Sequence, residues 1–226
     1  TCQSTAFKIA HWDFDVCSLD GQSGTVVDVK NGINGITQGN VSSDENGRFC
    51  QALGFDGGSY VNIPHHHGFA LAEGTLSVWL NVESHSGDPS DRQAVLSKDG
   101  AQGRSDGQFT LAVDGQGYLL FTLGNAGQTT TLYTAQTITA GQWHHVVLQW
   151  SGSRVQVYLD GVYQGGNSTA YSWEANSQPI VFGSSMVNLP NNVVTAGLLS
   201  DFFTGQIDDV KFFNGELSNS EIQALY

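Results

Sequence analysis

Hydrophobic and polar residues alternate along many short segments of this chain, which is the pattern of β-strands that bury one face. The clearest case is residues 74–82 (GTLSVWLNV), where Leu76, Val78 and Leu80 share one side of the predicted strand. Further strands are predicted at 7–15, at 53–64 as two strands around a Gly-Gly turn, and at 94–97, 109–113, 118–123, 129–133, 143–150, 154–160 and 180–183. Turn residues separate these segments at intervals of roughly 8–12 residues, which predicts an all-β sandwich.

Residues 205–226 predict a last strand followed by a short helix. Asn214 and Gly215 end the strand, because both residue types tolerate the positive φ of a tight turn. Ser218 and Glu221 have the spacing of a capping box, in which two side chains satisfy free amides at the start of a helix. The expected fold class is therefore all-β, a two-sheet antiparallel jelly-roll sandwich with a short C-terminal helix.

Asp208 is the unusual residue of this last strand. A period of two places its carboxylate on the same face as Val210 and Phe212, the face turned towards the core. A carboxylate there needs a partner, because an unpaired charge away from water is very costly. The chain has 8 Lys and Arg residues against 21 Asp and Glu residues, so a metal cation is a credible partner. We interpret Asp208 as a Ca²⁺ ligand.

Composition narrows the classes of function. The chain has 226 residues, with 28 Gly, 4 Pro and 13% charged residues, which suits one domain over 1–226 built from many strands and tight turns. The formal net charge of −13 repels nucleic acid and anionic membrane surfaces. No apolar run reaches the roughly 20 residues of a membrane span. We therefore expect neither a nucleic-acid partner nor membrane insertion.

Three cysteines bear on the compartment in which the protein works. Cys17 and Cys50 flank a Gly-, Asn- and Asp-rich segment with little core-forming sequence, which a disulfide would stabilise by roughly 3–4 kcal/mol. Two free thiols in a cytosolic protein are the alternative. Low lysine content and the acidic balance favour export. We predict the Cys17–Cys50 disulfide and an extracellular location, with Cys2 left over.

Six segments, in order along nearly the whole chain, resemble the laminin-G-like, concanavalin A-like jelly-roll superfamily in its bacterial LamG branch. They are residues 12–15 (WDFD), 55–61 (FDGGSYV), 74–79 (GTLSVW), 141–146 (GQWHHV), 158–161 (YLDG) and 205–226. The cysteine pair, together with residues 97–99 and 107–110 (GQFT), is most similar to the LamG module of MshQ-type proteins of mannose-sensitive pilus systems. Gln108 stands where such modules often have His.

The resemblance implies a structural Ca²⁺ between the opening and closing strands, and a role in surface recognition of glycan or protein. Asp15, Asp56 and Asp208 are its candidate ligands, because the resemblance places their strands side by side and Ca²⁺ takes roughly six to eight oxygens. The alternative is that Asp56 only caps its turn and that Asp15 is solvated. Binding function does not transfer with this fold, since its rims and faces serve different ligands.

Other residues are candidates for contact with a ligand. Asp99, Asp106 and the Asp88/Asp91 pair lie in predicted polar loops and could hold a second Ca²⁺ that bridges ligand hydroxyls, and solvated turn carboxylates are the alternative. Tyr133 and Trp173 could stack on the apolar face of a sugar ring, or pack in the core or at the rim. The consecutive histidines at 65–67 point in different directions, which disfavours a Zn²⁺ site.

The sequence lacks the catalytic patterns that the superfamily implies. Retaining glycosidases of this type carry two carboxylates on an E-x-D-x-x-E strand, whereas the glutamates here are scattered over loops and the last helix. We predict a non-catalytic, Ca²⁺-stabilised recognition module of a secreted or surface bacterial protein, suited to adhesion and pilus systems, that binds glycan or a cell-surface protein. The alternatives are a spacer that contacts only neighbouring domains of a larger chain, and an accessory domain of a polysaccharide-active enzyme.

Overall fold

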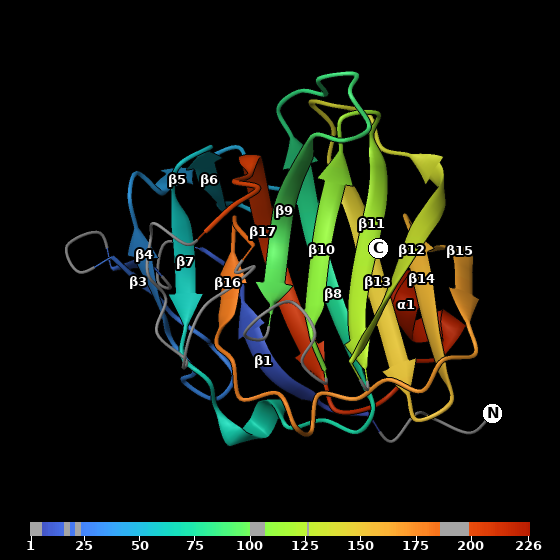
Figure 1. Ribbon diagram of the computed structural model, residues 1–226. Helices are drawn as coiled ribbons and strands as arrows, with labels where there is room; N and C mark the ends of the chain where they lie inside the picture. Colours follow the sequence, from blue (N-terminus) through green and yellow to red (C-terminus); the bar gives the residue numbers. More distant parts are fainter. Residues whose placement is uncertain (1–5, 16–18, 21–23, 100–106, 126, 186–198) are drawn as a thin grey trace.

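Two antiparallel sheets pack face to face in a sandwich (Figure 1). The computed structural model describes residues 6–15, 19–20, 24–99, 107–125, 127–185 and 199–226. Sheet A has the order β15 (Val162–Asn167), β14 (Arg154–Leu159), β13 (His144–Ser151), β8 (Gly74–Val82), β17 (Thr204–Phe213), β6 (Ala52–Asp56) and β5 (Ser42–Asp44), and β1 (Lys8–Trp12) also pairs with β17. Sheet B has the order β12 (Gln128–Thr137), β11 (Tyr118–Asn125), β10 (Phe109–Asp114), β9 (Arg92–Lys98), β16 (Ile180–Phe182), β7 (Tyr60–Ile63), β4 (Gly35–Gln38), β3 (Thr25–Val26) and β2 (Leu19–Asp20).

The helical segments follow local sequence signals. The helix α1 (Asn219–Leu225) begins after Ser218, whose hydroxyl accepts from the Glu221 amide while the Glu221 carboxylate accepts from the Ser218 amide. This is the predicted capping box. A single 3₁₀ turn, η1 (His67–Phe69), follows β7. The predicted fold class, an all-β two-sheet antiparallel jelly-roll sandwich with a short C-terminal helix, is confirmed.

Aromatic rings fill the centre of the sandwich. Trp150 and Trp173 lie with ring centroids 4.6 Å apart, and Trp173 lies 5.5 Å from Phe212. Trp12 continues the series at 6.0 Å from Phe212. All four side chains are fully buried, so each removes a large apolar area from water and contributes to the stability of the core.

A bulge in β17 changes the face on which Asp208 lies. The pairing of β17 with β8 shifts between Asp208 and Lys211, and the bulged residue Asp209 has a φ of 52°. Ile207 and Val210 therefore both face the core, while Asp208 lies opposite Trp79 on the outer face of sheet A. The prediction that Asp208 shares a face with Val210 is wrong, because an inserted residue breaks the period of two.

Part of the outer face of sheet A is covered. The side chain of Ile222 on α1 packs against Val147 and Tyr158, so the helix lies behind sheet A in the view of Figure 1. Further along the face, Trp79 is covered by the Arg48 guanidinium at 4.4 Å and by the Tyr226 ring at 5.7 Å. These contacts leave the two ends of the face open.

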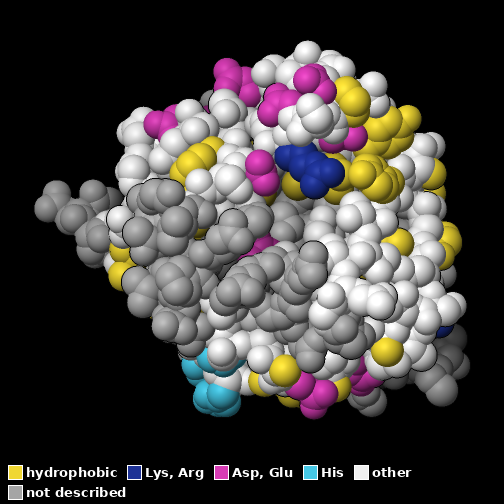
Figure 2. All heavy atoms as spheres, viewed as in Figure 1, with side chains coloured by type: hydrophobic (Ala, Val, Ile, Leu, Met, Phe, Trp, Pro, Cys, Tyr) yellow, Lys and Arg dark blue, Asp and Glu magenta, His cyan; other side chains and the backbone are white. Residues whose placement is uncertain are grey.

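The visible surface agrees with the acidic composition. On the face shown in Figure 2, acidic side chains lie at many places near the edges and in the upper middle, whereas basic side chains are few. Among the described residues, no helix has the length and hydropathy needed to cross a membrane.

Candidate functional site

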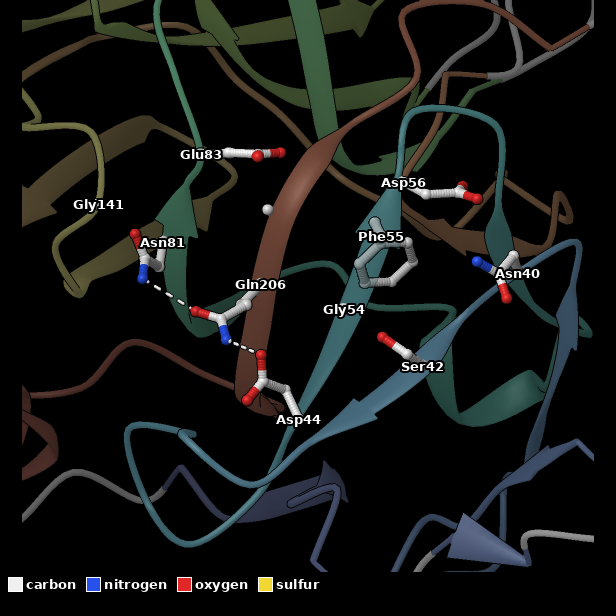
Figure 3. A pocket seen from close by; sticks show the side chains of 11 residues that line it. Asn40, Ser42, Asp44, Gly54, Phe55, Asp56, Asn81, Glu83, Gly141 and Gln206 are labelled. Carbon is white, nitrogen blue, oxygen red and sulfur yellow. Dashed lines mark hydrogen bonds between the residues drawn. The ribbon is translucent and has the colours of Figure 1, made fainter.

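A polar groove lies on the outer face of sheet A, where β8, β17, β6 and β5 run side by side (Figure 3). Its volume is about 380 Å³. The floor is a row of residues that lie opposite one another on the four strands, in the order Asn81, Gln206, Gly54 and Ser42. The polar side chains that line the groove are Asn40, Ser42, Asp44, Asp56, Asn81, Glu83 and Gln206. Residues from three distant parts of the sequence therefore meet at one site.

Hydrogen bonds fix the amide side chains of this row. The Asn81 amide nitrogen donates to Gln206 Oε1 at 2.9 Å, and Gln206 Nε2 donates to Asp44 Oδ2 at 2.5 Å (Figure 3). Asn81 Oδ1 is buried and has no hydrogen-bond partner among the described residues. The groove thus presents orientated amide and carboxylate groups, and such a set suits a ligand rich in hydroxyls.

Two glycines shape the groove. At Gly54, an added Cβ would lie 2.5 Å from Ser42 Oγ, so any larger residue would fill the hollow between β17 and β5. At Gly205, φ is 149° and an added Cβ would lie 2.2 Å from the Asn81 carbonyl oxygen. Only glycine accommodates both that backbone conformation and the close approach of β17 to β8.

Carboxylates give the groove a negative potential. Asp44, Asp56 and Glu83 line it, and none of its lining residues is Lys, Arg or His. A hydrogen bond from the Asn46 amide lowers the pKa of Asp44, and one from the Ser59 hydroxyl lowers the pKa of Asp56. These two groups are therefore ionised at neutral pH and act as hydrogen-bond acceptors.

The structure brings two of the three predicted Ca²⁺ ligands to one loop. Asp208 Oδ2 accepts from the Phe49 amide at 2.9 Å, and Asp15 Oδ1 accepts from the Gln51 amide at 3.2 Å. Asp56 instead lies in the polar groove, opposite Thr204, which places it about 13 Å along β17 from Asp208. Among the described residues, no three His, Cys, Asp or Glu side chains form a group that could hold a metal ion.

The environment of Asp208 disfavours the ionised form of its carboxyl group. Its side chain is fully buried, and Oδ1 has no hydrogen-bond partner in the part of the chain that the structure describes. Burial raises the pKa of Asp208 to about 7. At neutral pH this carboxyl therefore needs either a proton or a cation.

The predicted ligand-contact residues do not form a common site. Trp173 is fully buried, and its Nε1 donates to the Tyr171 hydroxyl at 2.8 Å. The prediction that Trp173 stacks on a ligand is therefore wrong. Asp99 is also fully buried and accepts from Thr110 Oγ1 at 2.5 Å, so it is not an open loop carboxylate. Tyr133 is 52% exposed on β12 of sheet B. Asp106 lies outside the described residues.

The cysteine prediction is not tested in full. Cys50 is exposed, has a φ of 55° and forms no disulfide within the described part of the chain, and both Cys17 and Cys2 lie outside the described residues. The Cys17–Cys50 bridge stays a prediction.

His65 is the first of the three consecutive histidines at 65–67. Its pKa is lowered, chiefly because the side chain is partly buried.

The polar groove was not predicted from the sequence. Asn81 occupies an outward position of the predicted strand at 74–82, whereas the period of two that placed Asp208 with Val210 also places Gln206 on the core face. The sequence pattern therefore did not predict that these two amides meet. Ser42 and Asp44 lie in a polar stretch without alternation, so no strand was expected there. Only the sheet order places these residues together.

Comparison with known proteins gives the family of the chain. Residues 55–223 match the sequence profile of the Laminin_G_3 family, described as the concanavalin A-like lectin/glucanases superfamily. Usherin from Rattus norvegicus is 28% identical over 176 residues, which are 75% of this chain and 3% of usherin. This chain therefore spans only a small part of that relative.

Solved structures share the fold. Domain 4 of AbnA, a GH43 extracellular arabinanase from Geobacillus stearothermophilus, was solved in complex with arabinotriose; it is 19% identical with a TM-score of 0.67, covering 98% of this chain and 99% of that domain. The binding domain of Paraclostridial Mosquitocidal Protein 1 is 16% identical with a TM-score of 0.71, covering 96% of this chain and 51% of that one. From the match over residues 55–223, the chain belongs to the concanavalin A-like lectin/glucanases superfamily.

Proposed function

We propose that the chain is a non-catalytic module of a secreted or surface protein, and that its polar groove binds a neutral oligosaccharide. The observation that carries the proposal is the row of Asn81, Gln206, Gly54 and Ser42, in which two hydrogen-bonded amides lie beside an opening made by glycine. Membership of a superfamily of lectins and glucanases supports it. The similarity to an arabinanase domain solved with arabinotriose supports it further.

The chemistry of the groove favours neutral sugars. Amides and hydroxyls both donate and accept, and ionised carboxylates accept strongly, so together they match the hydroxyl groups of a sugar. Asp44, Asp56 and Glu83 repel uronic and sialic acids, and no basic side chain among the lining residues compensates. The formal net charge of −13 acts in the same direction at longer range.

The same carboxylates disfavour glycoside hydrolysis. A glycosidase needs one carboxyl with a raised pKa to protonate the leaving oxygen. In the groove, hydrogen bonds lower the pKa of both Asp44 and Asp56. Burial raises the pKa of two described carboxyls, Asp201 and Asp208, and neither lines the groove. Asp208 is buried beneath the loop that carries Phe49.

Filling the groove should abolish glycan binding. We expect Gly54→Val to weaken binding at least tenfold on an array of neutral and acidic oligosaccharides, because the added methyls occupy the hollow beside Ser42. Gln206→Ala removes the central amide without adding bulk and should also lose binding. Gly152→Val is the matched control, since Gly152 has no atom within 4 Å of an added Cβ.

The array has two decisive outcomes against the proposal. Either the wild type binds no neutral oligosaccharide, or both groove variants bind as the wild type does while circular dichroism shows that they are folded. The first outcome favours a spacer that contacts only neighbouring domains, such as one in a pilus-associated protein. That alternative is supported by the small share, 3%, that the matched segment occupies in usherin.

We also propose that Ca²⁺ stabilises the loop at residues 48–51. The support is the unpartnered buried oxygen of Asp208, together with Asp15, whose carboxylate meets the same loop. Backbone carbonyls would supply the remaining ligands that Ca²⁺ requires, and Asp56 is not among them.

Removal of calcium should lower the melting temperature. When the Ca²⁺ concentration is far above its Kd, binding adds a few kcal/mol to the free energy of unfolding. We therefore expect EDTA to lower Tm by about 5 °C at neutral pH. Re-addition of Ca²⁺ should restore Tm, whereas Mg²⁺ should restore less of it. An unchanged Tm in EDTA, together with no metal by elemental analysis, would contradict the proposal.

A further inference from the structure

A second hollow lies on the same face of sheet A, at the opposite corner from the polar groove. It lies over β13, β14 and β15 beside the start of α1, and its volume is about 550 Å³. We name it the tyrosine cleft. The lining residues that matter here are Gln149, Arg154, Gln156, Tyr158, Tyr163 and Asn219.

The tyrosine cleft contains an accessible aromatic ring, which the polar groove lacks. Tyr163 is 53% exposed, and its ring meets the Tyr158 ring edge-on with centroids 5.5 Å apart. The Tyr163 hydroxyl lies 3.2 Å from the position of an added Cβ on Gly166, so the ring extends beside a stretch of β15 that has no side chain. In the polar groove the one aromatic lining residue is Phe55, which is only 5% exposed.

The polar groups around this ring carry little net charge. Arg154 forms a bidentate pair with Glu216, with Nε–Oε1 at 3.1 Å and Nη2–Oε2 at 2.7 Å. The paired carboxylate neutralises the guanidinium, so the cleft has no free cation to attract an acidic ligand. The Gln156 side chain lines the cleft and is partly exposed, so its amide can reach a ligand.

We propose that the tyrosine cleft is a second sugar-binding site, in which a neutral sugar ring stacks on Tyr163 and its hydroxyls bond to Gln156 and Asn219. An exposed ring beside amides and a neutralised guanidinium suits a ligand with one apolar face and an edge of hydroxyls. The inference rests on the proposed function and adds a second site to it.

The two sites are too far apart for one short oligosaccharide. β14 and β17 are three strand spacings apart, or about 14 Å, and the pairing of Gln156 with Gln149 and of Gln149 with Thr75 sets the cleft about 20 Å along the strands from Asn81. The sites are therefore about 25 Å apart on one face. A polysaccharide or a branched glycan that engages both gains affinity through effective concentration.

NMR of protein labelled with ¹³C on tyrosine rings tests the cleft directly. The neutral probes are arabinotriose, cellotriose and mannotriose, and trigalacturonic acid is the anionic probe. We expect at least one neutral trisaccharide, but not the anionic one, to shift the Tyr163 resonance, which is assigned from its loss in Tyr163→Phe. Tyr163→Ala should weaken this binding about five- to tenfold, whereas Tyr163→Phe, which keeps the ring, should stay within about twofold of wild type.

Variants of the two sites separate this inference from the proposed function. The second assay measures binding to the linear polysaccharide of the sugar whose trisaccharide shifts the Tyr163 resonance. Tyr163→Ala and Gly54→Val should each weaken this binding at least tenfold. No shift of Tyr163 with any neutral probe, while Gly54→Val still abolishes binding, would overturn the tyrosine cleft and leave the polar groove standing. Loss of binding in Tyr163→Ala alone would support the cleft and overturn the groove.

Discussion

Trp173→Ala is expected to lower the free energy of unfolding by about 3–5 kcal/mol, measured by urea denaturation at neutral pH. Trp173 is fully buried, packs against Trp150 with centroids 4.6 Å apart, and donates to the Tyr171 hydroxyl. Its removal leaves a cavity between the two sheets and takes a donor from a buried hydroxyl. Both effects add to the lost transfer energy of the indole ring.

The same variant decides between a packing role and a binding role for Trp173. Trp143→Ala is the matched control, because Trp143 is only partly buried and should cost less than half as much. Below the unfolding transition, Trp173→Ala should bind oligosaccharide as the wild type does. A cost below about 1 kcal/mol together with a loss of glycan binding would return this tryptophan to a ligand site.

Asp208→Asn should raise stability at pH 8 in EDTA by about 2 kcal/mol, a value discounted for screening at the loop, and should have little effect at pH 4. The folded pKa of Asp208 is about 7, against an ordinary 3.8. As pH rises from about 4 to 7, the unfolded chain releases a proton that the folded protein keeps. The wild type therefore loses stability across this window, and the loss is complete above pH 7.

His145 has the opposite pH dependence. Burial lowers the pKa of His145 to about 4 from an ordinary 6.5, so its contribution is present above pH 6.5 and is lost as pH falls towards 4. In the wild type, the opposite effects of Asp208 and His145 on the pH dependence of stability partly cancel. Asp208→Asn removes the first effect, so the loss of stability with falling pH that His145 causes should become visible. Urea denaturation from pH 4 to 8 measures both.

Calcium should reverse the effect of this substitution. If Asp208 binds Ca²⁺, Asp208→Asn is more stable than the wild type in EDTA and less stable in excess Ca²⁺. Asp91→Asn is the control, because this exposed carboxylate should show neither effect. A variant that is less stable than the wild type at pH 8 in EDTA would contradict the raised pKa of Asp208.

Local signals predicted most of the fold. Residues 74–82 form β8 with the predicted ends, and Ser218 and Glu221 form the predicted capping box. These features depend on neighbours within a few residues, so alternation and spacing are sufficient to find them. The resemblance to the concanavalin A-like superfamily is likewise confirmed by the match over residues 55–223, whereas the similarity to MshQ-type modules stays a prediction.

Features that depend on sheet pairing could not be predicted in the same way. The bulge at Asp209 reverses the face of Asp208, and no local pattern marks it. Trp173 lies in a segment rich in polar residues, yet rings from distant strands enclose it. The polar groove requires β17 to lie between β8 and β6, which is a property of the topology.

The position of β17 has a consequence for how the chain folds. This strand pairs with β1, β6 and β8, which lie far earlier in the sequence. A nascent chain that has completed β6 and β8 therefore exposes their unpaired backbone edges until Thr204–Phe213 is synthesised. Such late, long-range closure slows folding and leaves a period in which the growing polypeptide is open to aggregation or capture by chaperones.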